Sequence, residues 1–266
     1  MDNKHIQRIT LSKIQHNSPA TTVAVMVLCV FSVGAKAGNR TIAAPDAREV
    51  YTKNSPGWLR AVGKLQVPGQ RVQAGQRQHH LEDCSATLVS SRTNARVDTI
   101  ITAWHCLEYY KDLSKRITFT LVTDSPEPFT SEVYRLADGG SMEADWAIMR
   151  LYQPVPVEHA YPLKVHPGRA DKGTSIVMAG FSSDDNLGQY GQLLTYDPQC
   201  RITLQASSTS DSDCRALKGS SGGAVVQISE SGEARLSGVI SQGNGLGVST
   251  FTPVAGFRSA ISRHLR

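Results

Sequence analysis

The sequence predicts an all-β fold with a single helix at the C-terminal end. Short runs of β-branched and apolar residues recur along the chain with Gly, Asp, Asn and Ser between them, a spacing typical of an antiparallel barrel or sandwich. The stretch from Val254 to Leu265 predicts the helix, because its apolar residues recur at helical spacing. The expected strands are Trp58–Val67, Ala86–Val89, Thr99–Thr102, Thr118–Val122, Ala147–Leu151, Ser175–Ala179, Gln192–Tyr196, Ala224–Ile228 and Leu236–Ser241.

The composition indicates a folded chain with little preference for anionic partners. The 266 residues are 40% hydrophobic and 19% charged, which is too apolar for a disordered protein and long enough for a substantial core. The formal net charge is +5, but residues 1–37 hold four basic side chains against one acid. The remainder has 24 Lys and Arg against 22 Asp and Glu, without a basic cluster, so we expect no nucleic-acid partner.

The N-terminal segment has the features of a secretory signal. Basic residues precede an almost wholly apolar run, Val23–Val33, and Ala35-Lys36-Ala37 gives the small-x-small pattern of a cleavage site. We therefore expect residues 1–37 to be a signal peptide, residues 38–57 an N-terminal extension or propeptide, and residues 58–266 the folded domain. The apolar run is shorter than the roughly 20 residues of a membrane span. The expected product is exported, periplasmic or secreted, with no stable membrane span. The long polar region before the apolar run leaves open the alternative that the segment is an uncleaved membrane anchor.

Four cysteines remain after removal of the signal, an even number in an oxidising compartment. They permit three pairings, of which the local one, Cys84–Cys106 with Cys200–Cys214, closes two short loops and is expected. The rival is a zinc site, but the sequence contains no C-x2-C or H-x3-H pair. We therefore expect disulfides, no metal and no cofactor.

Three short segments carry residues suited to nucleophilic catalysis. His105 follows an apolar run, Asp145 opens another, and Ser221 lies in the glycine-rich turn GSSGGA. A serine hydroxyl needs a base to remove its proton, and that base needs a carboxylate to hold its tautomer. The glycines leave room for the backbone N–H groups of Gly219 and Ser221 to form an oxyanion hole. A disulfide from the neighbouring Cys106 would also fix the backbone of the histidine.

The order of these residues excludes a competing hydrolase. The sequence around Ser221 fits G-x-S-x-G, the nucleophile elbow of α/β-hydrolases, whose acid and histidine follow the serine. Beyond Ser221 the chain has no Asp, and its one histidine is His264 near the terminus.

The motifs resemble those of the chymotrypsin/trypsin-fold serine proteases, particularly the compact bacterial exported members. TAWHC is similar to T-A-A-H-C, ADWAIMRL to the D-[IL]-A-[LIV] segment, GSSGGA to G-D-S-G-G-P, and GVISQG to the strand that lines the substrate cleft. The resemblance extends from Trp58 to the end. It implies two antiparallel six-stranded β-barrels with the site between them, and a C-terminal helix. It also implies that His105 is the base, Asp145 the orienting acid and Ser221 the nucleophile.

The resemblance is incomplete around the substrate pocket. Ser220 stands where the family has an acid, which in the digestive members pairs with the freed N-terminus, so the oxyanion loop must be ordered in another way. Ser241 and Gly243 are expected in the pocket walls, but the preferred substrate side chain does not follow from the sequence.

The expected function is that of an exported serine endopeptidase, monomeric and acting on polypeptides. The alternative is a catalytically silent relative that binds peptides or a surface ligand. Because all three triad residues are present, the sequence gives that alternative no positive support.

Overall fold

The computed structural model describes residues 45–91, 96–111, 114–122 and 127–265. The expected signal peptide and the first seven residues of the extension lie outside this part, so the predicted boundaries at residues 37 and 57 stay predictions. Within the described residues, no helix has the length and apolar character needed to cross a membrane.

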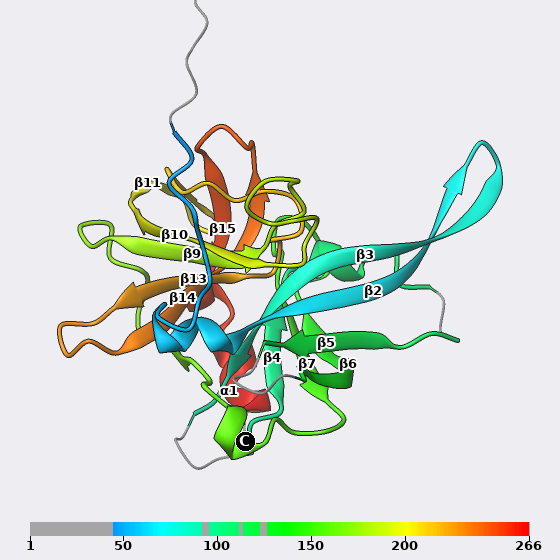
Figure 1. Ribbon diagram of the computed structural model, residues 1–266, viewed down its shortest axis with the longest axis horizontal. Coiled ribbons are helices and arrows are strands. Elements are labelled where there is room, and N and C mark those ends of the chain that lie inside the picture. Colours follow the sequence, from blue (N-terminus) through cyan, green and yellow to red (C-terminus); the bar gives the residue numbers. More distant parts are fainter. Residues whose placement is uncertain (1–44, 92–95, 112–113, 123–126, 266) are drawn as a thin grey trace, which may run out of the picture. The chain divides into compact units, whose positions relative to one another are not determined.

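The N-terminal half of the fold is a closed barrel of six antiparallel strands, as predicted (Figure 1). Its strands pack apolar side chains inward, and the alternation is clear in Ile117, Phe119 and Leu121, which are buried while their neighbours are half-buried. In barrel order, the strands are β2 (Val62–Gln73), β3 (Gln76–Val89), β4 (Thr99–Thr102), β7 (Ala147–Leu151), β6 (Phe129–Asp138) and β5 (Ile117–Leu121).

The C-terminal half differs from the second six-stranded barrel that we expected. Its strands form one nine-stranded sheet, whose edge strands β1 and β11 do not pair with each other in the described part of the chain. The two-barrel prediction is therefore confirmed for the first barrel only. The main path is β1 (Glu49–Val50), β10 (Leu194–Cys200), β9 (Ile176–Phe181), β13 (Ala224–Ile228), β14 (Ala234–Gly243), β15 (Ser249–Pro253), β12 (Ser210–Ser212) and β11 (Ile202–Gln205), and β8 (Lys164–Val165) pairs with β14.

The C-terminal helix is present but shorter than predicted. A 3-10 turn, η4 (Val254–Gly256), comes first, and the α-helix α1 (Arg258–His264) follows it. Phe257 between them has a non-helical backbone, with φ −131° and ψ 19°, so the α-helix begins only at Arg258. Two contacts join this region to β7 of the barrel and to the residue that precedes it. The Trp146 ring stacks on Phe257 with centroids 4.7 Å apart, and the Arg150 guanidinium donates to the His264 carbonyl oxygen.

Two further differences from the sequence prediction concern the N-terminal part. Trp58 lies in a 3-10 turn, η1 (Gly57–Ala61), and the strand begins only at Val62. Strand β2 also continues past the predicted end at Val67, and β3 begins well before the predicted start at Ala86, so that the two form a long hairpin (Figure 1). Ala74 and Gly75 close it with positive φ values of 48° and 78°. Remaining 3-10 turns are η2 (Trp104–Leu107) and η3 (Val157–His159).

Candidate active site

His105 lies in η2, directly after strand β4 of the barrel. The next residue, Cys106, forms a disulfide with Cys84 of β3, which ties the backbone of the histidine to a neighbouring strand. The His105 side chain is 23% exposed, so one edge of the ring can meet a substrate while the rest is held by protein.

Asp145 holds His105 through two hydrogen bonds. Its side chain is completely buried just before β7. Oδ1 accepts the backbone N–H of His105 at 2.9 Å, and Oδ2 lies 2.8 Å from the ring nitrogen Nδ1. Ser241 Oγ donates a third hydrogen bond to Oδ2 at 2.5 Å. A carboxylate is only an acceptor, so Nδ1 carries the proton and Nε2 is left as the acceptor that a general base needs.

Ser221 lies in the tight turn that leads into β13, and this turn packs directly on the barrel. The Ser85 N–H donates to the Ser221 carbonyl oxygen at 2.8 Å. Gly222 allows this approach, because a Cβ atom there would lie 2.1 Å from Thr102 Oγ1, and its φ is +83°. Ser221 Oγ donates to the Ser241 carbonyl oxygen at 3.5 Å. Among the described residues it makes no hydrogen bond to His105.

The turn also presents two unpaired backbone N–H groups. Within the described part of the chain, the amides of Gly219 and Ser221 donate to no acceptor, whereas the Ser220 amide between them donates to the Leu217 carbonyl oxygen at 3.0 Å. Gly219 has φ +91°, a conformation that favours glycine. The two amides are those expected in the oxyanion hole, and their N–H groups are available to an anion.

Ser85 is a residue of this site that the sequence did not reveal. It lies on β3 beside Cys84 and is completely buried. Its Oγ donates to the Gly219 carbonyl oxygen at 2.9 Å and accepts the Phe181 N–H at 2.8 Å. One hydroxyl therefore joins the barrel, the turn that carries Ser221 and strand β9. A buried serine on a strand has no sequence signal that would single it out.

The expected pocket walls lie in contact with each other. Ser241 is buried and directs its hydroxyl at Asp145. A Cβ atom on Gly243 would lie only 2.1 Å from the Ala216 carbonyl oxygen, so the end of β14 touches the segment that precedes Gly219. Ser249 Oγ lies behind this contact, where it accepts the Ala216 N–H and donates to the Cys214 carbonyl oxygen, both at 2.8 Å. The end of β14 and the segment that precedes Gly219 therefore pack directly against each other.

The structure contains both disulfides in the predicted pairing. Cys84–Cys106 lies beside His105, and Cys200–Cys214 lies in the core of the C-terminal sheet, just before the segment that leads to Ser221. Each of these four sulfur atoms is bonded to another, so none of them is a thiolate that could hold zinc.

Comparison with known protein families matches residues 84–234 to the trypsin-like peptidase domain. The matched region is more than half of the chain and contains His105, Asp145 and Ser221. No curated protein matches the chain. The family match and the arrangement of barrel, sheet and C-terminal helix agree, and the chain belongs to the trypsin-like peptidase family.

Proposed function

We propose that the protein is an exported serine endopeptidase that hydrolyses peptide bonds through an acyl-enzyme on Ser221. The observation that carries the proposal is the buried Asp145 carboxylate, which binds His105 at both its backbone N–H and Nδ1. A structural histidine needs no such double contact, whereas a general base needs a fixed ring and a fixed tautomer. The unpaired backbone N–H groups of Gly219 and Ser221 also support a catalytic site, because they can form an oxyanion hole.

In the proposed reaction, Ser221 Oγ leaves the Ser241 carbonyl oxygen and attacks the carbonyl carbon of the scissile peptide bond. His105 Nε2 takes the hydroxyl proton, and Asp145 stabilises the imidazolium that forms. The oxyanion accepts hydrogen bonds from the N–H groups of Gly219 and Ser221. Breakdown of this intermediate breaks the C–N bond, and His105 gives its proton to the leaving amine. Water then attacks the Ser221 ester with the same proton transfers through His105, which releases the acid product and restores the Ser221 hydroxyl.

A fluorophosphonate probe tests the proposed nucleophile directly. The probe phosphonylates a serine only where a base activates it, so the folded protein should acquire one adduct, located at Ser221 by mass spectrometry. Ser221→Ala and His105→Ala should both abolish the adduct while the thermal unfolding transition persists. Wild-type protein unfolded in denaturant is the control for non-specific labelling. Labelling at another serine, or equal labelling of the His105→Ala variant, would contradict the assignment.

The second candidate is a catalytically silent relative that binds peptides in the same place. The observation that favours it is the position of Ser221 Oγ, which points to the Ser241 carbonyl oxygen rather than to His105. Such a protein would bind peptides without cleaving them and would not react with the probe. Export is proposed from the leader together with the two disulfides, which are typical of an oxidising compartment.

A further inference from the structure

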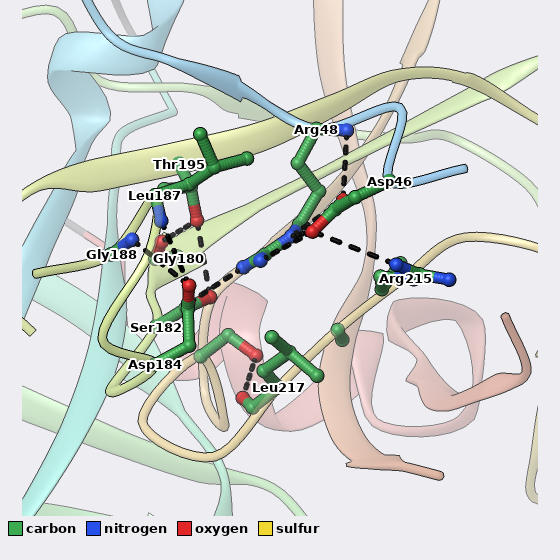
Figure 2. A network of polar contacts seen from close by, with 12 residues as sticks. Asp46, Arg48, Gly180, Ser182, Asp184, Leu187, Gly188, Thr195, Arg215 and Leu217 are labelled. Carbon is green, nitrogen blue, oxygen red and sulfur yellow. Dashed lines mark hydrogen bonds and ion pairs between the residues drawn. The ribbon is translucent and has the colours of Figure 1, made fainter. Parts of the chain in front are cut away.

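A segment that precedes the predicted protease domain binds the C-terminal sheet beside the candidate site. Glu49 and Val50 form the short strand β1, which pairs with Tyr196 and Thr195 of β10. The Arg48 side chain, only 2% exposed, lies between two carboxylates (Figure 2). The segment is therefore built into the fold through a strand pairing and a buried cation.

Arg48 forms ion pairs on both sides. Its Nη2 atom lies 2.8 Å from Asp46 Oδ2, and its Nη1 atom lies 3.0 Å from Asp184 Oδ2. Burial raises the pKa of the Asp184 carboxyl, but the hydrogen bonds from Arg48, Gly188 and Leu187 outweigh this effect and leave the pKa lowered. Both partners are therefore charged at neutral pH, and the loss of either would leave an uncompensated charge in a largely buried place.

Asp184 shapes the loop that follows β9. Its second oxygen, Oδ1, accepts the backbone N–H groups of Leu187 and Gly188 at 2.9 and 3.3 Å. The ion pair with Arg48 fixes this carboxylate from the other side (Figure 2). The conformation of residues 183–191 therefore depends on an arginine that lies 136 residues earlier in the chain.

This loop in turn fixes a peptide group of the candidate oxyanion hole. The backbone N–H of Ser183, next to Asp184, donates to the Lys218 carbonyl oxygen at 2.6 Å. That carbonyl shares its peptide group with the Gly219 N–H. The C=O and N–H of a trans peptide point in opposite directions, so the hydrogen bond directs the Gly219 N–H away from the loop. A second contact runs from Asp46 Oδ2 to Arg215 Nη1, at 3.6 Å, in the segment leading to Gly219.

We propose that Arg48 is a positioning residue for the oxyanion hole, so that the segment from Asp46 onward is required for catalysis and is not an inhibitory propeptide. The inference rests on the proposed function. It accounts for Ser220, which stands where related enzymes have an acid for the freed N-terminus. Ser220 Oγ donates to the Leu217 carbonyl oxygen at 2.5 Å, and an internal arginine orders the neighbouring loop instead.

Substitution of Arg48 tests this role, with Arg150 as the matched control. Arg150 is a similarly buried arginine, 5% exposed and paired with the buried Asp98, and its other polar contacts in the described part of the chain are with Thr99 and His264. Below the unfolding temperature of every variant, Arg48→Met should lower kcat about 10- to 100-fold with KM little changed, since a lost oxyanion donor lowers kcat by about 100- to 1000-fold. Arg48→Lys should restore part of the loss. Arg150→Met should lose stability but keep kcat. An Arg48→Met variant with the kcat of Arg150→Met would overturn the proposal.

Two further measurements separate this proposal from the proposed function. Hydrogen exchange followed by mass spectrometry should show faster exchange over residues 183–191 and 215–221 in Arg48→Met, whether or not any form of the protein is catalytic. Unchanged exchange there would overturn the positioning role. A protein that begins at Asp46 should react with the fluorophosphonate probe, and one that begins at Trp58 should react far more slowly. Faster labelling of the form beginning at Trp58 would instead identify an inhibitory propeptide.

Discussion

Replacement of Ser85 by alanine removes the hydroxyl that joins β3 to the turn carrying the candidate nucleophile. Two buried backbone groups then lose their partner, the Gly219 carbonyl oxygen at 2.9 Å and the Phe181 N–H at 2.8 Å. A buried polar group left without a partner costs about 1–3 kcal/mol. The free energy of unfolding should therefore fall by roughly 2–6 kcal/mol, which is a shift in Tm of about 4–24 °C for a chain of this size.

The same substitution should also slow the chemical step. The Ser85 hydrogen bond fixes the peptide group that joins Gly219 to Ser220, between the two proposed oxyanion donors. A hydrogen bond contributes about 0.5–1.5 kcal/mol net, so kcat should fall by about 2- to 13-fold while KM changes little. Denaturant unfolding gives the stability, and initial rates on a peptide substrate, measured below the transition of the variant, give kcat and KM.

Ser131→Ala is the matched control for Ser85→Ala. Ser131 is also a buried serine whose hydroxyl donates to one carbonyl oxygen and accepts one backbone N–H, from Gln153, but it lies on β6. Its replacement should cost similar stability and leave kcat unchanged. A role of Ser85 in positioning the turn is excluded if Ser85→Ala has the kcat of the control, or if both variants lose activity in proportion to their stability.

Three other predictions follow from the geometry. Gly222→Ala should abolish probe labelling and the native unfolding transition, because its Cβ would overlap the barrel at a positive φ; a folded, reactive variant would contradict this. The lowered pKa of Asp184 gives stability that is complete above its usual value of 3.8 and is lost as pH falls through the folded value. Tm should therefore depend less on pH below about 4 in Arg48→Met than in wild type, and identical profiles would argue against the ion pair. Because Gly243 touches the Ala216 carbonyl oxygen, we expect a narrow substrate pocket, and the peptide bonds cut in a peptide library should be those that come directly after Gly, Ala or Ser. A preference for bonds after Phe, Lys or Arg would contradict a narrow pocket.

The strands next to the candidate triad were predictable from the sequence. Thr99–Thr102, Ala147–Leu151 and Ala224–Ile228 coincide with β4, β7 and β13. Each is a short, almost completely buried run bounded by turn residues, and such a run has few alternatives to a core strand. The motifs that carry His105 and Ser221 adjoin these strands, so the approximate place of the site followed from the sequence as well.

Other parts of the fold depend on partners distant in the chain. Strand β6 (Phe129–Asp138) is largely polar, and only Ser131 and Val133 of it are buried. The sequence does not reveal it, because its pairing with β5 and β7 determines it. The open C-terminal sheet likewise depends on which strands meet at its edges. Arg48 lies in a segment without apolar periodicity, and its role follows only from the contact with Asp184. Ser85 acts on Gly219, 134 residues later.

Rapid acid quench tests whether Ser221 becomes acylated during turnover. The protein would be mixed with an excess of a peptide that it binds, quenched over a series of times, digested and analysed by mass spectrometry. The acyl half of the substrate should appear on Ser221 while the amine product is released, and neither should appear with Ser221→Ala. Peptide binding with no acylated protein and no released amine would contradict it and identify a silent binding protein instead.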